Sequence, residues 1–426
     1  MPLKRRILQR IGLFVLSFLG LIDRFFGSTY TGIDADVSRR DPYIGLKILR
    51  ERGSLLRTYR FSGWLVLGFD DVQSVFKDKR FSSDMRKNRF ISRLLRAGSE
   101  DGYVPTLDDP GILNLDPPDH TRIRKLVSPA FMRKYIASLE PRIREIVDDC
   151  LEDAGDALDI VNQLAKPLPA IVIAELLGLP RKDLPRFQQL SNELLGLTQL
   201  EDLEAQQTAT IANKILIDYF ADIIEQKRKS PGQDLICQLI DAEDEGDRLS
   251  AREMYSTCVL LLLAGHETTT RLISNGMYLL LNHPEQLARL QAEPELIPNA
   301  IEEILRFEPP VQLMPRFALE DMRFNGRPIK KNQMCLVSIA SANRDENANP
   351  DPDVFDITRK DIKHVSFGYG IHLCLGLALA RLEGKIAIEA LLTRFPDMTL
   401  AKQELEWDTS LLVRGTSHLY VDTNLH

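Results

Sequence analysis

Apolar residues recur at every third or fourth position along much of this 426-residue chain, which is the spacing of one face of an α-helix. The stretch 143–151 shows this spacing, and similar helical stretches cover about 205–228 and 284–307. Strand-like runs are few and short. The pattern therefore predicts a mainly α-helical protein with minor β-structure.

Short strands are predicted between these helices. The run 57–69 reads as a hairpin, and Asn325-Gly326 is the expected turn of a second hairpin, because both residue types tolerate the backbone angles of tight turns. The run 333–340 is predicted to be a further strand. The run 411–421, near the C-terminus, reads as another hairpin.

A helix is predicted to begin at Asp116, Pro117 and Pro118. Aspartate is a frequent capping residue, and proline is tolerated in the first turn of a helix because the N–H it lacks would have no partner there.

The longest predicted helix begins at Ser250 and ends before Pro284, about 32 residues or roughly 48 Å. Ser250 and Glu253 have the spacing of a capping box. Residues 258–265 are apolar on every face, which predicts burial on all sides. The sequence AGHETTT (264–270) then interrupts the apolar run with residues that weaken a helix. A buried helix that gives up stability at mid-span is a candidate functional site.

His266 and Glu267 resemble the start of the zinc-protease pattern H-E-x-x-H, which needs a second histidine at position 270. That residue is Thr270, so this zinc site is excluded. A surface salt bridge is the alternative interpretation of Glu267.

The glycine-rich loop FGYGIHLCLG (367–376) places Cys374 two residues after His372. The helix-forming run that follows puts the sulfur at a helix N-terminus, where the dipole and free N–H groups favour a thiolate. Such a thiolate could be a nucleophile with His372 as its base, or a metal ligand. Zinc would need further cysteine or histidine ligands, which this stretch lacks, whereas haem iron needs one axial cysteine.

The composition narrows the class of protein. The net charge is −7 and no basic run is present, which argues against nucleic-acid binding. The chain has five cysteines, an odd number, and no C-x-x-C spacing, so a reducing compartment fits better than a disulfide framework. The four cysteines other than Cys374 are interpreted as small buried apolar residues.

Residues 1–29 form a leader of different composition. Four cationic side chains fall among the first ten residues, and the run 11–22 is uncharged. This run is shorter than the ~20 residues that span a bilayer, and no A-x-A-like cleavage site follows it. Attachment of residues 1–27 to a membrane surface and packing on a soluble body are both left open. The expected location is the cytoplasm, with the inner membrane surface as the alternative.

Several segments together resemble the cytochrome P-450 family. FGYGIHLCLG matches every fixed position of that family's haem-binding loop, and AGHETT resembles its acid–alcohol stretch. Glu303 and Arg306 resemble its Glu-x-x-Arg pair. The segment 352–359 resembles the one whose arginine joins that pair, and 116–131 resembles its haem-facing helix.

The resemblance covers roughly residues 30–426, as one catalytic domain, and is closest to the soluble bacterial branch. It implies the P-450 fold, in which a long central helix passes over haem beside small β-sheets. The basic and apolar leader departs from that branch.

The resemblance also implies haem b, with Cys374 as the axial thiolate ligand of the iron. Four side chains would bind the two haem propionates: His120, Arg124, Arg316 and His372. The other implied cofactor-binding residues are Phe367, Gly368, Gly376 and Ala264.

Further roles follow from the same resemblance. Thr268 would position and donate protons where O₂ is activated, and Glu267 would relay them from solvent. Glu303, Arg306 and Arg359 would form a structural network. The implied substrate-lining residues are apolar: Leu260, Leu263, Ala264, Val311, Leu313, Leu412 and Val413.

The implied activity is a monooxygenase that hydroxylates or epoxidises a lipophilic small molecule of terpenoid, steroid, fatty acid or polyketide type. Electrons would come from a ferredoxin or flavodoxin with its reductase, docking on a basic surface near Cys374. The candidates for that surface are Arg122, Lys125, Arg133 and Lys363. A peroxide-driven peroxygenase, a haem-thiolate ligand sensor and a cysteine hydrolase remain as alternatives.

Overall fold

A computed structural model of the chain describes residues 41–59, 63–99, 101–194, 196, 203–244, 249–408, 410 and 412–424. The predicted leader, residues 1–29, lies outside these ranges, and its attachment to a membrane stays a prediction. Within the described ranges, no helix is both long enough and apolar enough to cross a bilayer.

Helices make up most of the structure, as the apolar spacing predicted. The α-helices are α3 (Pro42–Arg52), α4 (Phe69–Lys77), α5 (Arg89–Gly98), α6 (Pro105–Asp108), α7 (Asp119–Val127), α8 (Arg133–Ser138), α9 (Glu140–Leu151), α10 (Pro167–Leu177), α11 (Leu184–Leu194), α12 (Leu203–Lys229), α13 (Leu235–Asp244), α14 (Ala251–Asn282), α15 (Pro284–Ala292), α16 (Ile297–Phe307), α17 (Ile339–Asn343) and α18 (Leu377–Arg394). Shorter helical turns are η2 (Met85–Lys87), η3 (Ile112–Asn114), η4 (Ser128–Phe131), η5 (Val161–Ala165), η6 (Arg181–Asp183), η8 (Pro294–Leu296) and η9 (Gly370–His372).

In the part of the chain that the structure describes, the strands form three small sheets. They are β1 (Leu55–Thr58), β2 (Gly63–Val66), β3 (Phe81–Ser82), β4 (Ala157–Asp159), β5 (Leu313–Ala318), β6 (Met322–Phe324), β7 (Arg327–Ile329), β8 (Met334–Ser338), β9 (Thr399–Leu400) and β10 (Tyr420–Asp422). The largest sheet has the order β1-β2-β8-β5-β3, the second β4-β10-β9, and the third is the β6-β7 hairpin. The predicted fold class, mainly α with minor β, is confirmed.

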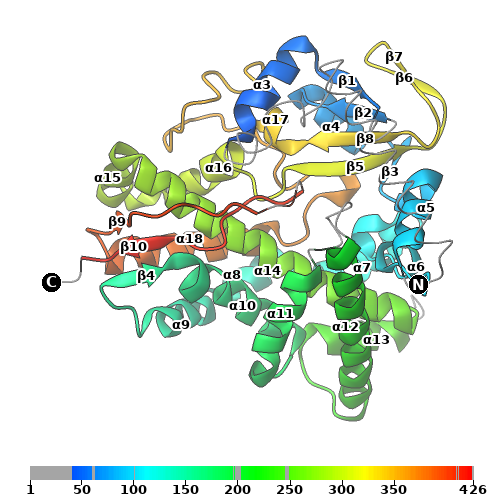
Figure 1. Cartoon of the computed structure of the whole chain (residues 1–426). Helices are drawn as coiled ribbons and strands as arrows, with labels where there is room; N and C mark the ends of the chain where they lie inside the picture. Colours follow the sequence, from blue (N-terminus) through cyan, green and yellow to red (C-terminus); the bar gives the residue numbers. More distant parts are fainter. Residues whose placement is uncertain are drawn as a thin grey trace.

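Helix α14 runs through the middle of the molecule, with the largest sheet on one side and α9 to α13 on the other (Figure 1). It contacts α10, α12, α16 and α18. Its capping box at Ser250 and Glu253 is present, and its 32 residues end at Asn282, just before Pro284. The long helix predicted from the sequence is therefore confirmed.

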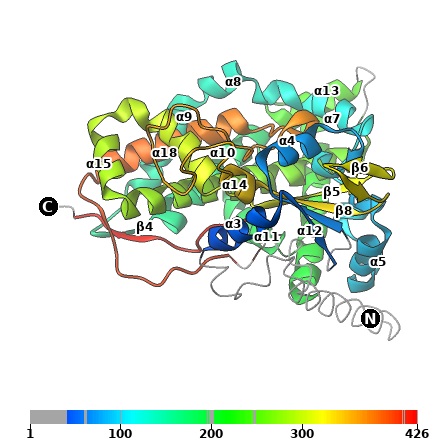
Figure 2. The ribbon, with the colours of Figure 1, turned by 90° about the horizontal axis from the view of Figure 1, so that it is seen from above.

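Both predicted hairpins of the N-terminal and middle regions are also confirmed. Strands β1 and β2 pair antiparallel, with Leu55 opposite Val66. Strands β6 and β7 pair around Asn325 and Gly326, which have φ angles of 44° and 71° and so adopt the left-handed conformation of a tight hairpin turn. The view from above shows β5, β6 and β8 toward the end of the molecule that lies opposite the C-terminus (Figure 2).

Two local predictions are wrong in detail. The N-cap residue of α7 is Pro118, whereas the Asp116 carboxylate accepts hydrogen bonds from the Ser83 N–H at 3.0 Å and the Ser82 hydroxyl at 2.5 Å. The Asp116 side chain therefore bonds these two serines and not the N–H groups at the start of α7. The helical stretch 284–307 is divided into α15, η8 and α16 near Pro294, because proline lacks the N–H that a continuous helix needs.

The hairpin predicted over 411–421 is wrong in the part of this run that the structure describes. Val413 bridges Val311, Thr416 bridges Trp407, and β10 pairs with β4 and β9. The alternating residues of this segment pair with strands from other parts of the chain. The sequence of the segment alone does not show which strands these are.

Candidate functional site

The loop that carries Cys374 is a tight turn between the core and α18. Gly368 and Gly370 have φ angles of 68° and 72°, which L-residues rarely adopt. A Cβ on Gly370 would also lie 2.6 Å from the Phe76 carbonyl oxygen. The Cys374 N–H donates to the Phe367 carbonyl at 2.8 Å and closes the turn. Glycine is therefore required here for both conformation and space.

Cys374 lies just before Gly376, the N-cap residue of α18, as the sequence predicted. The predicted stabilisation of a free thiolate is wrong, however. Burial raises the pKa of the Cys374 thiol, and the Gly376 N–H and the cations Arg124 and Arg381 only partly oppose this. A metal ion that binds this sulfur must therefore displace its proton.

Four predicted basic residues gather beside this loop, although they come from three parts of the chain. His120 and Arg124 lie one turn apart on α7, Arg316 lies on β5, and His372 lies in η9. The rings of His120 and His372 have centroids 4.2 Å apart. Arg124 donates to the Leu373 carbonyl at 2.6 Å, which fastens α7 to the cysteine loop. The structure thus brings these four predicted residues together.

Within the described residues, no carboxylate forms an ion pair with the basic cluster, although the Asp116 carboxylate acts on His120 and Arg316. His120 is 3% exposed, and neither of its ring nitrogens has a hydrogen-bond partner. Burial lowers the pKa of Arg316 to about 10, and burial together with Arg316, His120 and Arg124 lowers the pKa of His372 to about 3. Buried cationic groups with unpaired donors fit an anionic ligand, such as the two carboxylates of haem.

One face of α14 is accessible, contrary to the predicted burial of 258–265 on all sides. Leu260, Leu263 and Thr268 are partly exposed and Ala264 is exposed, while most of their neighbours on the helix are buried. The Thr268 hydroxyl donates to the Ala264 carbonyl at 2.8 Å. This apolar stripe with one hydroxyl suits a flat apolar cofactor and an apolar substrate.

Glu267 points away from that stripe. Its side chain is 5% exposed and lies 3.3 Å from Arg271 Nη2 and 3.5 Å from His266 Nδ1. Glu267 therefore belongs to a buried ionic cluster, and the surface salt bridge considered as its alternative role is excluded. The sequence did not reveal Arg271 as its partner, although the i, i+4 spacing was a usable signal.

The predicted network of Glu303, Arg306 and Arg359 is present. Arg306 and Glu303 are both 0% exposed and pair through two contacts of 2.7 Å. Arg359 Nε lies 3.5 Å from Glu303 Oε2. This network joins α16 to the segment 352–359 that precedes the cysteine loop.

The predicted substrate-lining residues are only partly gathered. Val311 and Val413 face each other in an antiparallel bridge, and Leu412 is partly buried. Leu313 is 5% exposed and packs in a core cluster with Leu46 and Leu65, so its place in a substrate pocket stays a prediction.

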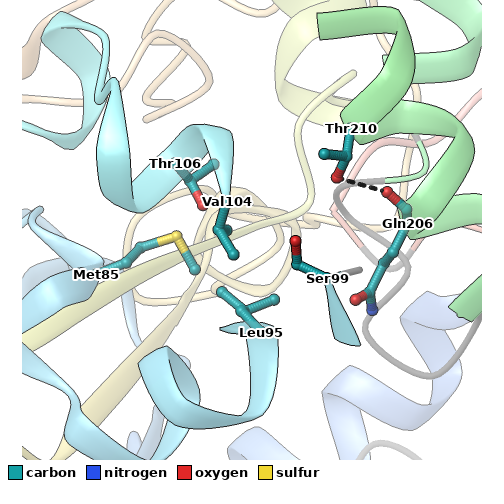
Figure 3. Close-up of a pocket in the computed structure, with 7 residues that line it drawn as sticks. All are labelled: Met85, Leu95, Ser99, Val104, Thr106, Gln206 and Thr210. Carbon is teal, nitrogen blue, oxygen red and sulfur yellow. Dashed lines mark hydrogen bonds between the residues drawn. The ribbon is translucent and has the colours of Figure 1, made fainter. Parts of the chain in front are cut away.

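A small cavity lies between α5, α6 and α12, and none of its residues was predicted (Figure 3). It is lined by Met85, Leu95, Ser99, Val104, Thr106, Gln206 and Thr210. Its volume of about 40 Å³ has room for a few water molecules or one small substituent. No local motif marks these residues, since they meet only through packing of α12 on the segment 85–106.

Three of the four cations predicted for a donor-docking surface are exposed, and the docking surface itself stays a prediction. Lys125, Arg133 and Lys363 are exposed. Arg122, in contrast, forms ion pairs with Glu253 and with Asp119. Two apolar residues of the cysteine loop are also exposed, Ile371 at 48% and Leu373 at 40%.

The family model named Cytochrome P450 matches residues 64–412, so the chain belongs to the cytochrome P450 family of haem-thiolate monooxygenases. Two relatives come from Saccharopolyspora erythraea. Cytochrome P450 107B1 is 43% identical over 84% of this chain and 88% of its own length. The 6-deoxyerythronolide B hydroxylase is 38% identical over 92% of this chain and 99% of its own length.

A solved structure agrees with these relatives. A myxobacterial cytochrome P450, CYP267B1 in complex with myristic acid, is 37% identical, with a TM-score of 0.84 over 91% of this chain and 98% of that chain. The chain is therefore a cytochrome P450 monooxygenase of bacterial type.

Proposed function

We propose that this enzyme holds haem b through Cys374 and hydroxylates or epoxidises a lipophilic small molecule, with electrons from a ferredoxin or flavodoxin. The observation that carries the cofactor assignment is the buried basic cluster beside the cysteine loop, with its unpaired nitrogens. Haem bound there would supply activation of O₂ and insertion of one oxygen atom into the substrate.

His120, Arg124, Arg316 and His372 would bind the haem carboxylates. Burial lowers the pKa values of all four residues, and a bound anion would oppose this effect. The anion would favour the charged forms of the two histidines, whereas the two arginines are charged at neutral pH without it. Gly376 supports this placement, because a Cβ there meets no atom within 4 Å and the loop is open beside it.

Phe367 and Gly368 would shape the loop around the sulfur. The Arg381 guanidinium lies 4.4 Å from the Phe367 ring centroid, which fixes the ring. The same guanidinium pairs with Glu302 at 2.8 Å. Although burial alone would raise it, Arg381 and His364 lower the pKa of Glu302 to about 2, so this support stays charged.

Thr268 would hold and donate protons on the accessible face of α14, and Glu267 would supply them. Ala264 would leave room for the flat cofactor. Leu260, Leu263, Val311, Leu313, Leu412 and Val413 would line the substrate space. These assignments rest on family resemblance and on the accessible stripe of α14.

A lipophilic substrate is supported by this apolar lining and by two of the similar proteins. One is named for hydroxylation of 6-deoxyerythronolide B, and the other is a complex with myristic acid. We infer a substrate of polyketide or fatty acid type as the first class to examine, before terpenoids and steroids.

The purified holoprotein tests the proposal by titration with macrolides, fatty acids, terpenoids and steroids, followed in the Soret band. We expect one class of compound to convert the haem iron to high spin in a saturable way. We also expect a surrogate ferredoxin system to oxygenate that compound. Cys374→Ser should remove the absorbance typical of the reduced carbon monoxide complex of a haem thiolate. A normal complex in Cys374→Ser would contradict the ligand assignment. Turnover with peroxide but not with the ferredoxin system would contradict the monooxygenase assignment.

Electron donors are usually acidic, so the exposed cations Lys125, Arg133 and Lys363 would attract them. Arg133→Glu and Lys363→Glu should slow the first electron transfer at low salt, and less at high salt. Lys402→Glu, at an exposed position on the C-terminal segment, is the control. Equal rates in all variants would argue against this surface.

Residues 1–27 would attach the enzyme to an anionic membrane surface, as their basic and apolar composition indicates. Flotation of the full chain with vesicles containing anionic lipid tests this. Recovery of the full chain at the bottom of the gradient, like that of a chain starting at residue 30, would refute it.

A further inference from the structure

Arg271 is placed between two carboxylates from distant parts of the chain. Its Nη2 lies 3.3 Å from Glu267 Oε2, one turn earlier on α14. Its Nε lies 2.8 Å from Asp408 Oδ2, and its Nη2 donates to Asp408 Oδ1 at 3.2 Å. The side chains of Arg271 and Glu267 are 4% and 5% exposed, whereas that of Asp408 is 20% exposed. Asp408 is therefore the side of this cluster that water reaches.

A turn in the C-terminal segment, residues 407–416, places Asp408 next to Arg271. A Cβ on Gly415 would lie 1.9 Å from Arg271 Cδ, so only glycine lets the backbone approach the arginine this closely. The Asp408 N–H donates to the Gly415 carbonyl at 2.9 Å, and Trp407 bridges Thr416. This turn holds the aspartate against the guanidinium.

The hydrogen bonds of this cluster are incomplete. Arg271 Nη1 and His266 Nε2 have no partner, and Arg271 Nε and Asp408 Oδ2 are close without the alignment of a hydrogen bond. Buried donors are normally satisfied. A guanidinium with unmet donors between two acceptors can change its pairing at low cost, because neither pairing satisfies it fully.

Other charged or titratable groups lie around Arg271, on α14 itself and on the segments that pack against it. Lys166 follows η5, and burial and Arg271 lower its pKa, while Glu267, Asp159 and Asp408 raise it. Burial raises the pKa of Asp408, against the effect of Arg271. Burial lowers the pKa of His266, although Glu267 acts in the opposite direction. Arg271 is thus the central cation that both carboxylates share.

We propose that Asp408 is a positioning residue for proton delivery: it competes with Glu267 for Arg271, and so releases Glu267 to take up a proton and pass it to Thr268. The proton enters from water on the Asp408 side and moves to a Glu267 carboxylate oxygen. It leaves to the Thr268 hydroxyl once the released Glu267 side chain turns from Arg271 toward the accessible face of α14. No bond other than these O–H bonds forms or breaks. The inference rests on the proposed function, because it takes Glu267 as the proton carrier.

Asp408→Asn removes the competitor and leaves Arg271 to Glu267 alone. A closer cation favours the charged carboxylate, so the titration midpoint of Glu267 should move to lower pH by about one unit. The readout is the ¹³C signal of the Glu267 carboxyl in protein labelled with [δ-¹³C]glutamate, as the reduced carbon monoxide complex, assigned by its loss in Glu267→Gln. The fraction of electrons recovered in product should fall several-fold at neutral pH and recover at lower pH.

Three further variants separate this role from a structural one. Asp408→Glu should restore both readouts. Glu406→Gln removes a carboxylate from the same turn at an exposed position and should change neither. In a background of Arg271→Gln, Asp408→Asn should cause no further shift, because the arginine through which it acts is gone.

An unchanged Glu267 midpoint in folded Asp408→Asn would overturn the proposal, as would a shift that persists in the Arg271→Gln background. Failure of the proposed function has a different signature. If Glu267→Gln itself leaves the electron recovery and its pH dependence unchanged, Glu267 is not the proton carrier, whatever Asp408 does.

Discussion

Two buried arginines, Arg306 and Arg271, differ in how fully their N–H groups are hydrogen-bonded. The five N–H groups of Arg306 meet five oxygen atoms: both oxygens of Glu303 and the carbonyls of Asn343, Pro352 and Val354. Arg271 is almost as buried, but its Nη1 has no partner and its two carboxylates are shared. A fully satisfied arginine holds one arrangement, whereas an incompletely satisfied one can exchange partners.

A third site completes the comparison, because it has a carboxyl group facing no cation. Glu383 on α18 is 1% exposed and hydrogen-bonds Thr269 on α14. Burial raises the pKa of Glu383 to about 8. Glu303, Glu267 and Glu383 thus form a series in which the carboxyl group has a full, a shared and no cationic partner.

Loss of the fully satisfied pair should have the largest effect. Glu303→Ala leaves Arg306 buried without its carboxylate, and breaking a buried ion pair costs roughly 3–5 kcal/mol. We expect no folded holoprotein, measured by haem content and by the reduced carbon monoxide complex. Normal haem content in this variant would show that the network is not needed for the fold.

Glu383, the carboxyl group without a cationic partner, should make the free energy of unfolding depend on pH. The pKa of Glu383 is about 8 in the folded protein and lies near 4.5 when the group is exposed, so the folded state binds this proton more tightly. Its contribution is complete below about pH 4.5 and is lost as the pH rises toward 8, with a slope of up to about 1.4 kcal/mol per pH unit. Urea unfolding of wild type and Glu383→Gln between these pH values measures it. Identical slopes in the two proteins would contradict the assignment.

Arg271→Met should destabilise the protein less than loss of Glu303 does. The substitution removes the N–H groups of Arg271 that have no hydrogen-bond partner. Water can hydrate Asp408, because its side chain is 20% exposed. Only Glu267 is left buried, so the cost should lie toward the lower end of the roughly 3–5 kcal/mol that a broken buried ion pair costs. The midpoint of urea unfolding measures the difference. A loss as large as that of Glu303→Ala would remove the distinction between the two arginines.

Thr268→Ala should have the smallest effect on stability, because Thr268 is partly exposed and its hydroxyl only bonds the Ala264 carbonyl within the same helix. Its effect should be on coupling: reductant consumed would yield peroxide in place of product. Thr269→Ser, one position along α14, keeps a hydroxyl and is the control. Product and peroxide are measured per reductant consumed, and unchanged coupling in Thr268→Ala would refute its role.

Local motifs made part of this site predictable. The glycine loop and the capping box at Ser250 each encode a conformation within ten residues or fewer, so their positions followed from the sequence. The Glu303–Arg306 pair was expected only from the family resemblance. The basic cluster needed the family resemblance, because Arg316 and His120 are far apart in the chain. Asp408 could not be predicted at all, since its role depends on a C-terminal turn that the sequence pattern suggested was a different hairpin.

The sequence by itself determined the mainly helical fold class, the long helix α14, the tight cysteine loop and, through resemblance, the family. These depend on periodicity, caps and glycine conformations, which act over a few residues. Tertiary structure alone decided which face of α14 is accessible, that Cys374 is buried enough to raise its pKa, and that Arg271 lies between Glu267 and Asp408. Burial and charge pairing depend on contacts between distant segments, and no local pattern specifies them.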